Sequence, residues 1–274
     1  MKVNTFIVGV QKAGTTSLYE WLIQHQDVCG EIFLKDYPFF NDPELFGQGN
    51  SLLENRFTCL EKPIVVTGCV DYIENPEGLK RIKEYNPNAK IIVVLRNPEK
   101  RIRSAFKFLR QLSKEKYDNI NDAIKNDPAY INRSLYSRKL DVLYNIFPKE
   151  QVKLVIFEQL TKMPESVLQE VFEFLGVPSQ DNIDYFNANK TGEARFKSVN
   201  KILFDKESNK AFRSVVKTLL PAKTRLKIQR FVKDYNTKKA APSQEESDLD
   251  PAYKELLQAD RKKLNSYFDV EEYW

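Results

Sequence analysis

The feature that most constrains the fold of this chain is the loop Gly9-Val-Gln-Lys-Ala-Gly-Thr-Thr-Ser17 near its start. An apolar, β-branched run over Val3–Val10 leads into this loop and predicts a buried strand. The run SLYEWLIQ begins at Ser17, and its apolar residues recur at helical spacing. A strand, a tight glycine loop and a helix are typical of phosphate-binding α/β domains, because the free N–H groups and the dipole of a helix start attract anions.

Further along the chain, short apolar runs alternate with amphipathic segments. We predict strands over Pro63–Cys69, Lys90–Leu95 and Val152–Phe157, and helices over Glu77–Tyr85, about Glu99 to Leu112, Leu135–Phe147 and Pro164–Leu175. This alternation predicts an α/β fold in which a P-loop-like parallel sheet carries helices on both faces.

The pattern is less regular after Asp181. There we expect a basic helix over Ala222–Lys239, an exposed loop with the sequence AAPSQEESD and a final helix over Pro251–Tyr267. The sequence has neither internal repeats nor a clear boundary between domains. We therefore expect a single domain over residues 1–274, with a core over about 1–200 and a helical C-terminal extension over about 201–274.

Charge and cysteine content narrow the classes of protein to consider. The net charge of +5 suits an anionic small ligand but is too small to indicate nucleic acid as a partner. The apolar runs are far shorter than the ~20 residues of a spanning helix, and the N-terminus lacks a signal-peptide pattern. Cys29, Cys59 and Cys69 lack close paired spacing and suggest neither a disulfide nor a zinc site. We therefore expect a cytoplasmic protein without a membrane span.

The loop differs from the usual nucleotide-binding loop in the place of its lysine. In G-x-x-x-x-G-K-[ST] the lysine follows the second glycine, whereas here Thr15 holds that place and the lysine is Lys12. The loop keeps its backbone cradle, one cation and the three hydroxyls of Thr15, Thr16 and Ser17. These groups suit a 5′-phosphosulfate better than ATP. The alternative is an ordinary turn between a strand and a helix.

A second cationic strand end lies at Arg96, directly before Asn97-Pro98. Ser104 follows eight residues later, in the segment where we predict a helix. Arginine is a permanently charged, bidentate ligand for phosphate, so Arg96 and Ser104 could bind a phosphate at the next crevice of the sheet.

The segments FIVGVQKAGTTSLYEWL and LRNPEKRIRS together resemble the two cofactor motifs of the PAPS-dependent sulfotransferases, in particular the bacterial and heparan-sulfate-type branch; PAPS is 3′-phosphoadenosine 5′-phosphosulfate. The later segments FEQL and VFEFLGV also resemble that family. The resemblance implies that Lys12 contacts the 5′-phosphate and the bridging oxygen, and that Arg96 and Ser104 contact the 3′-phosphate. The other cofactor-binding residues implied in the loop are Ala13, Gly14, Thr15, Thr16 and Ser17.

Sulfuryl transfer to an alcohol needs a general base. The single histidine, His25, lies just after the first predicted helix, where we expect a turn. The segment Lys35-Asp-Tyr-Pro-Phe-Phe40 resembles the family's K-E-x-H-F-F, in which the glutamate is catalytic, and Asp36 takes that position. We expect Asp36 to be the base, and Glu31 is the alternative.

Two departures from the family pattern concern the acceptor side. Pro38 stands where the resembled segment has histidine, and Gly68-Cys-Val-Asp-Tyr72 matches the family's K-T-P-x-Y without its lysine. Later, NKTGEARFK resembles a basic loop that covers the nucleotide, which makes Arg195 and Lys197 candidates for the 3′-phosphate or the adenine. A solvated run of charges is the alternative for these two residues.

The sequence thus predicts a sulfotransferase that moves a sulfuryl group from PAPS to a hydroxyl in one direct, in-line step, with Asp36 and Lys12 as catalytic residues and no metal. By resemblance we expect the acceptor to be a carbohydrate or glycolipid. The expected partners are PAPS, with its bisphosphate product PAP, and this acceptor; nucleic acid is not expected. The alternatives are a kinase-like phosphotransferase of the P-loop type and a non-catalytic nucleotide-binding module.

Overall fold

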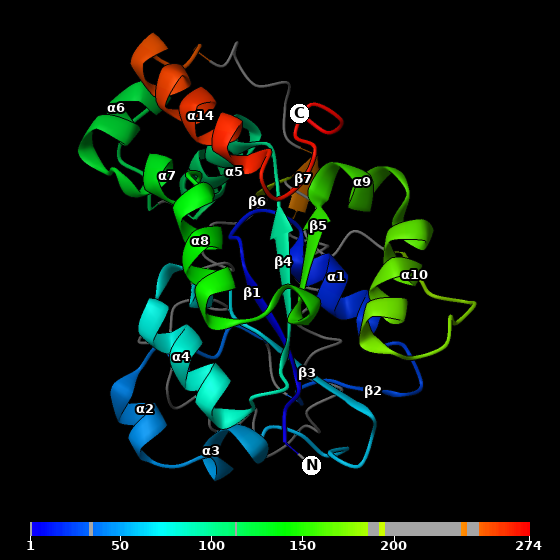
Figure 1. Cartoon of the computed structure of the whole chain (residues 1–274). Helices are drawn as coiled ribbons and strands as arrows, with labels where there is room; N and C mark the ends of the chain where they lie inside the picture. The colour runs from blue at the N-terminus through cyan, green and yellow to red at the C-terminus, as the bar shows by residue number, and fades with distance from the viewer. Residues whose placement is uncertain (1, 33–34, 113, 186–191, 195–236, 240–246) are drawn as a thin grey trace.

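A parallel sheet of five strands forms the centre of the molecule (Figure 1). The computed structural model describes residues 2–32, 35–112, 114–185, 192–194, 237–239 and 247–274. The strands are β1 (Thr5–Gly9), β2 (Val28–Cys29), β3 (Ile64–Gly68), β4 (Lys90–Leu95) and β5 (Val152–Ile156). Their order across the sheet is β2-β3-β1-β4-β5, and every neighbouring pair is parallel.

The central strands are buried along their length. All residues of β1 and β3 are buried, and in β4 only Lys90 is partly exposed. Continuous apolar runs of this kind are what a parallel sheet requires, because helices cover both of its faces and neither face meets water.

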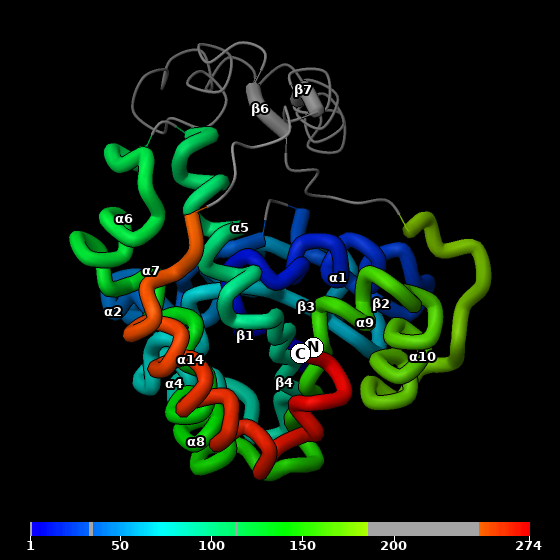
Figure 2. The backbone as a smooth tube through the Cα atoms, turned by 90° about the horizontal axis from the view of Figure 1, so that it is seen from above, coloured from blue at the N-terminus to red at the C-terminus, as the bar shows by residue number. Residues whose placement is uncertain are grey.

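Helices lie on both sides of the sheet, as two views of the molecule show (Figures 1 and 2). Helices α1, α9 and α10 lie on one side, and α4, α8 and α14 lie on the other. The α-helices are α1 (Thr15–Leu22), α2 (Pro43–Gly47), α3 (Ser51–Glu54), α4 (Pro76–Tyr85), α5 (Pro98–Gln111), α6 (Ile120–Asn126), α7 (Ala129–Asn132), α8 (Ser137–Ile146), α9 (Phe157–Lys162), α10 (Pro164–Leu175) and α14 (Pro251–Leu264), and the short 3₁₀ helices are η1 (Tyr72–Glu74) and η2 (Lys149–Gln151). The predicted α/β fold is therefore confirmed.

Asn-Pro pairs start two of the helices that follow strands. The side chain of Asn97 accepts the N–H of Lys100 at the start of α5, and Asn75 caps α4 in the same way. In both helices proline occupies the first turn, where its missing N–H costs nothing. These caps explain why the chain leaves the sheet abruptly at the carboxyl end of β4.

The order of the strands determines where a ligand can bind. Strand β1 has β3 on one side and β4 on the other, so the direction in which strands are added reverses at β1. In an open parallel sheet such a reversal leaves a crevice at the carboxyl ends of the two strands, and ligands bind there. The loop after β1 and the segment after β4 border this crevice.

The cysteines differ from the prediction. Cys29 and Cys59 form a disulfide, with their Cα atoms 5.6 Å apart, although 30 residues separate them in the sequence. Folding brings the end of β2 beside the segment after α3, where the N–H of Ile32 donates to the carbonyl of Arg56 at 2.8 Å. The prediction of no disulfide was therefore wrong, and Cys69 is a buried free thiol. The expected cytoplasmic location stays a prediction and loses the support of the cysteine pattern.

The C-terminal helix packs against the core. Helix α14 lies beside α8, and the Asp260 carboxylate accepts the N–H groups of Tyr136 and Ser137. Residues 237–239 form strand β7 (Thr237–Lys239), which pairs with β6 (Gly192–Ala194), so the predicted helix over Ala222–Lys239 is wrong at its end. Among the described helices, none has the length and apolar character needed to cross a membrane.

Candidate functional site

The loop after β1 reaches its helix through a glycine that no other residue could replace easily. Gly14 is the N-cap of α1 and has φ 83°. A Cβ atom at this position would lie 2.7 Å from Cδ2 of Phe157 on α9. The loop is thus pressed against α9, and the first N–H groups of α1, which lack helical partners, have no side-chain cap. This arrangement leaves a helix start ready for an anion.

The other predicted loop residues surround this helix start. Ala13, Thr15 and Ser17 are buried, and Thr16 is half-buried. Lys12 has φ 71°, and its Nζ lies 3.9 Å from the centroid of the Phe108 ring on α5. Lys12 therefore extends from the end of β1 toward the helix that follows β4.

Arg96 meets the loop from the neighbouring strand. Its Nη1 donates to the carbonyl of Lys12 at 2.9 Å, and its guanidinium carbon lies 4.4 Å from the centroid of the Phe157 ring. Burial lowers the pKa of Arg96, and the nearby carboxylate of Glu158 opposes this shift. Within the part of the chain that the structure describes, the buried Nε of Arg96 has no hydrogen-bond partner. Arg96 and the loop that carries Lys12, predicted from separate segments, thus meet at one crevice.

Ser104 lies on the same helix that Arg96 precedes. It is on the buried face of α5, together with Arg101 and Ala105. The exposed fraction of Ser104 is 9%. Arg195 and Lys197, the other predicted cofactor contacts, lie outside the described residues.

Asp36 is held in an unusual backbone conformation at the end of β3. Its φ is 73°, a left-handed value that is uncommon for a residue with a side chain. Its N–H donates to the carbonyl of Gly68 at 2.6 Å, and its Oδ1 accepts the N–H of Val70 at 3.1 Å. The side chain of Asp36 remains 45% exposed. These two contacts fix the carboxylate of Asp36 at the carboxyl edge of the sheet, where it is accessible to solvent.

Lys35 connects this carboxylate with the loop after β1. Its Nζ lies 3.0 Å from both carboxylate oxygens of Asp36 and 3.4 Å from Oγ1 of Thr15. Only 7% of the Lys35 side chain is exposed. Lys35 was not among the site residues predicted from the sequence; the available signal was its place directly before Asp36 in the segment KDYPFF.

Glu31, the alternative base, has a supporting role. Its carboxylate is buried, accepts Nε of Arg56 at 2.6 Å and accepts the hydroxyl of Thr67 at 2.5 Å. Burial raises the pKa of Glu31, while Arg56 and Thr67 oppose the shift. The Arg56 guanidinium in turn lies 4.1 Å from the centroid of the Tyr37 ring. Glu31 is thus buried and braced by Arg56 and Thr67, whereas the carboxylate of Asp36 is partly open to solvent; which of the two is the base stays a prediction.

His25 lies in the turn after α1, as expected. It is buried, its Nε2 lies 2.9 Å from the carbonyl oxygen of Pro178, and its Nδ1 accepts the N–H of Asp27 at 3.0 Å. These contacts are at the C-terminal end of α1, the opposite end from the glycine loop. His25 is therefore a packing residue.

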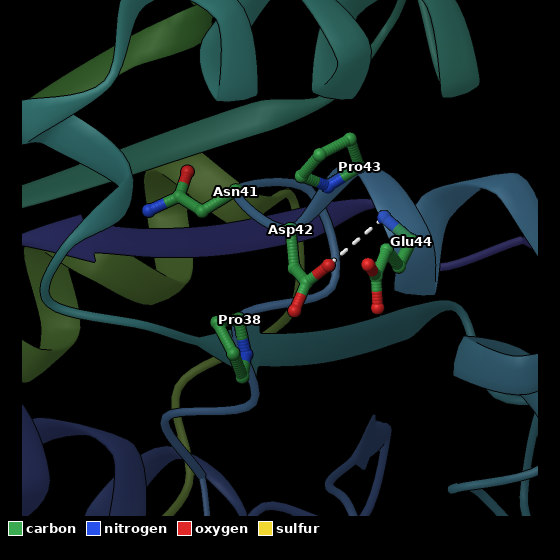
Figure 3. A pocket seen from close by; sticks show the side chains of 5 residues that line it. All are labelled: Pro38, Asn41, Asp42, Pro43 and Glu44. Carbon is green, nitrogen blue, oxygen red and sulfur yellow. Dashed lines mark hydrogen bonds between the residues drawn. The ribbon is translucent and has the colours of Figure 1, made fainter.

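An open depression follows Asp36 along the chain (Figure 3). Its volume is about 540 Å³, and its lining is Pro38, Asn41, Asp42, Pro43 and Glu44. Asp42 caps α2, since its Oδ1 accepts the N–H of Glu44 at 2.9 Å. Figure 3 shows the carboxylates of Asp42 and Glu44 side by side in this depression. Among the described residues, no group of three or more His, Cys, Asp or Glu side chains could hold a metal ion.

Comparisons with known proteins identify the family. A family model described as a sulfotransferase domain matches residues 2–233. The chain is 26% identical over 202 residues to human heparan sulfate glucosamine 3-O-sulfotransferase 5, covering 68% of this chain and 58% of that protein. It is 29% identical over 199 residues to mouse heparan sulfate glucosamine 3-O-sulfotransferase 6, covering 68% of this chain and 56% of that protein. The chain thus spans less than three fifths of the length of either relative. Among solved structures, a sulfotransferase from Alicyclobacillus acidocaldarius is 25% identical with a TM-score of 0.62, covering 69% of this chain and 87% of that one.

Proposed function

This chain belongs to the sulfotransferase family, and from that premise we propose that it transfers a sulfuryl group from PAPS to a hydroxyl of a carbohydrate or glycolipid. The match to the sulfotransferase domain shows the family. The activity, the donor, the acceptor and the roles of single residues are the proposed part.

One observation carries the choice of donor: Arg96 donates to the carbonyl of Lys12 across the crevice between β4 and β1. PAPS has a phosphosulfate at one end and a 3′-phosphate at the other. A helix start with a nearby lysine suits the first group, and a buried arginine followed by Ser104 suits the second. The kinase-like alternative lacks support, because Thr15 replaces the lysine after Gly14 and a cation, not a carboxylate, follows β4.

The proposed reaction is a single displacement at sulfur. The acceptor oxygen attacks the sulfur atom while Asp36 takes the hydroxyl proton. A bond forms between that oxygen and sulfur, and the bond between sulfur and the bridging oxygen breaks. The electron pair of the broken bond stays on the 5′-phosphate, so PAP leaves. Lys12 and the N-terminal N–H groups of α1 stabilise the charge that develops on the leaving phosphate.

The acceptor class comes from the relatives and from the open surface beside Asp36. The named relatives are sulfotransferases of heparan sulfate glucosamine. In this chain an exposed carboxylate at Asp36 is followed by the depression that Asp42 and Glu44 line. Carboxylate oxygens accept hydrogen bonds from sugar hydroxyls. A hydroxyl-rich chain lying in this depression could present one of its hydroxyls to Asp36.

The test is transfer of label from [³⁵S]PAPS to a panel of acceptors: a heparan-derived oligosaccharide, a neutral oligosaccharide, a glycolipid and a phenol. We expect label on a carbohydrate-containing acceptor. Asp36→Ala should lose transfer by about 10²-fold or more and keep its affinity for PAP, because a general base contributes about 10²–10⁴-fold. Asp118→Ala, which removes an exposed carboxylate paired with Arg110, is the control and should transfer normally. Label on none of the acceptors, or an Asp36→Ala variant as active as the unchanged protein, would contradict the proposal.

A further inference from the structure

We propose that Lys35 is a further catalytic residue, whose ammonium group contacts the sulfuryl group as it passes from the donor to the acceptor. This inference rests on the proposed function. The ammonium group of Lys35 lies between the loop that would hold the donor and the Asp36 carboxylate that would take the proton from the acceptor.

The ammonium group of Lys35 lies close to both the start of α1 and the carboxylate of Asp36. Nζ of Lys35 lies 3.4 Å from Oγ1 of Thr15, which is the first residue of α1, and 3.0 Å from both oxygens of Asp36. A donor phosphosulfate bound at the start of α1 and an acceptor hydroxyl at Asp36 must exchange the sulfuryl group between these two points. The ammonium of Lys35 is in contact with both points.

The side chain of Lys35 runs past Gly68 at the end of β3. A Cβ atom added to Gly68 would lie 3.7 Å from Cδ of Lys35, so the stem of Lys35 passes beside the space where a side chain at residue 68 would begin. Residue 68 is glycine in this chain, so no side chain of its own fills that space. Lys35 therefore supplies an ammonium group at the end of β3 where this chain has glycine.

The surroundings of Lys35 suit a group that stabilises charge. Its side chain is only 7% exposed, so water screens its charge weakly. Nζ of Lys35 contacts both carboxylate oxygens of Asp36 at 3.0 Å and Oγ1 of Thr15 at 3.4 Å, and a sulfuryl oxygen at the start of α1 would take the place of the longest of these contacts. The ion pair with the half-exposed Asp36 contributes little to folding stability, so a variant that lacks Lys35 should still fold.

The experiment compares Lys35→Ala with the double variant Lys35→Ala/Gly68→Lys, in which the lysine is moved to the adjacent strand end. Transfer from [³⁵S]PAPS gives kcat and KM, and calorimetry gives the Kd for PAP. We expect kcat of Lys35→Ala to fall about 10²–10³-fold, the usual loss for one charge-stabilising donor. The Kd for PAP, which has no sulfuryl group, should change less than about threefold. The double variant should recover at least about tenfold in kcat, because its ammonium enters the space that Lys35 leaves.

Two further measurements keep the result interpretable. If the double variant does not fold, added ethylamine should raise kcat of Lys35→Ala, since a free ammonium can occupy the vacated space. Lys153→Ala, which breaks an ion pair with Glu170 away from the site, should match the unchanged protein. A kcat of Lys35→Ala within threefold of the unchanged protein overturns the inference and leaves the proposed function intact. The inference is also overturned if neither the double variant nor ethylamine restores activity. If the unchanged protein transfers no label, the proposed function fails, and the inference fails with it.

Discussion

The indole N–H of Trp274 donates to Oε2 of Glu158 at 3.0 Å, while Oε1 of the same carboxylate accepts the N–H of Asn97 at 3.2 Å. Glu158 thus connects Trp274, which is 116 positions later in the sequence, with the backbone N–H of Asn97, the residue directly after Arg96. The Trp274 ring also packs against Tyr136, whose hydroxyl donates to the carbonyl of Arg96 at 2.9 Å. Two independent contacts therefore lead from Trp274 to the proposed 3′-phosphate ligand.

Replacing Trp274 by phenylalanine should weaken PAP binding about 3–10-fold. The variant keeps an aromatic ring against Tyr136 but removes a hydrogen bond to a carboxylate, which contributes about 1.5–3 kcal/mol where it forms. Calorimetric titration with PAP measures the effect. Tyr273→Phe, which alters the neighbouring residue, is the matched control, and an equal loss in both variants would refute the link to Arg96.

Arg96→Lys should weaken PAP binding about 10–100-fold. Lysine keeps the positive charge but lacks the planar fork that donates to the Lys12 carbonyl and reaches a phosphate at the same time. The Kd for PAP checks this expectation. Arg110→Lys, made in an exposed ion pair with Asp118, should bind PAP normally. Unchanged affinity in Arg96→Lys would remove Arg96 from the donor site.

Gly14→Ala should lower both stability and donor binding. The left-handed backbone at residue 14 costs an L-residue about 1–2 kcal/mol. The added methyl would also press on the Phe157 ring, and overpacking adds about 1–3 kcal/mol. Gly49→Ala separates these causes, because Gly49 has φ 92° with no atom within 4 Å of an added Cβ. Urea unfolding should show a larger loss for Gly14→Ala; equal losses would mean that contact with Phe157 is unimportant.

The unfolding free energy should fall as the pH rises through the titration of Glu31. Burial raises the pKa of Glu31 above its ordinary value, so the folded chain holds this proton at a pH where the unfolded chain has lost it. The contribution is complete below the unfolded pKa of about 4.3 and is lost as the pH rises through the higher folded pKa. Urea unfolding over a pH series should show a smaller fall for Glu31→Gln than for the unchanged protein. Glu170→Gln is the control, and parallel curves for all three proteins would contradict the expectation.

The number of cysteines that react with a thiol reagent should depend on unfolding and on reduction. The protein has three cysteines, of which Cys29 and Cys59 are joined and Cys69 is buried. Burial raises the pKa of Cys69 to about 12, so its thiolate is scarce at pH 8. A thiol reagent at that pH should label no cysteine in the native protein, one after unfolding, and three after unfolding with reduction. Three labelled thiols without a reductant would rule out the disulfide.

Much of the fold could be predicted because the signals are local. The run Lys90–Leu95 is continuously apolar, and Asn97-Pro98 ends it, so the strand and the start of α5 are both visible in the sequence. Lys12 and Arg96 could be singled out for the same reason, since Arg96 directly follows a recognisable strand and Lys12 lies in the glycine loop after another.

The rest depends on contacts between distant segments. The Cys29–Cys59 bond requires that the end of β2 lie beside the segment after α3, and no spacing rule reveals that neighbourhood. The role proposed for Lys35 depends on its stem lying beside Gly68, a residue more than thirty positions later in the sequence. Periodicity reports which face of an element is buried, but it does not report which side chain fills a given space.

Asp260 has a practical consequence for anyone who shortens this protein. Its carboxylate accepts the N–H groups that begin α8, and one of them belongs to Tyr136, which supports Arg96. A chain trimmed at residue 233, where the family match ends, would lose this anion and leave the start of α8 without its partner. Such a fragment would keep every residue of both cofactor motifs and yet hold its nucleotide loosely, so a weak fragment should not be taken as proof that the enzyme binds poorly.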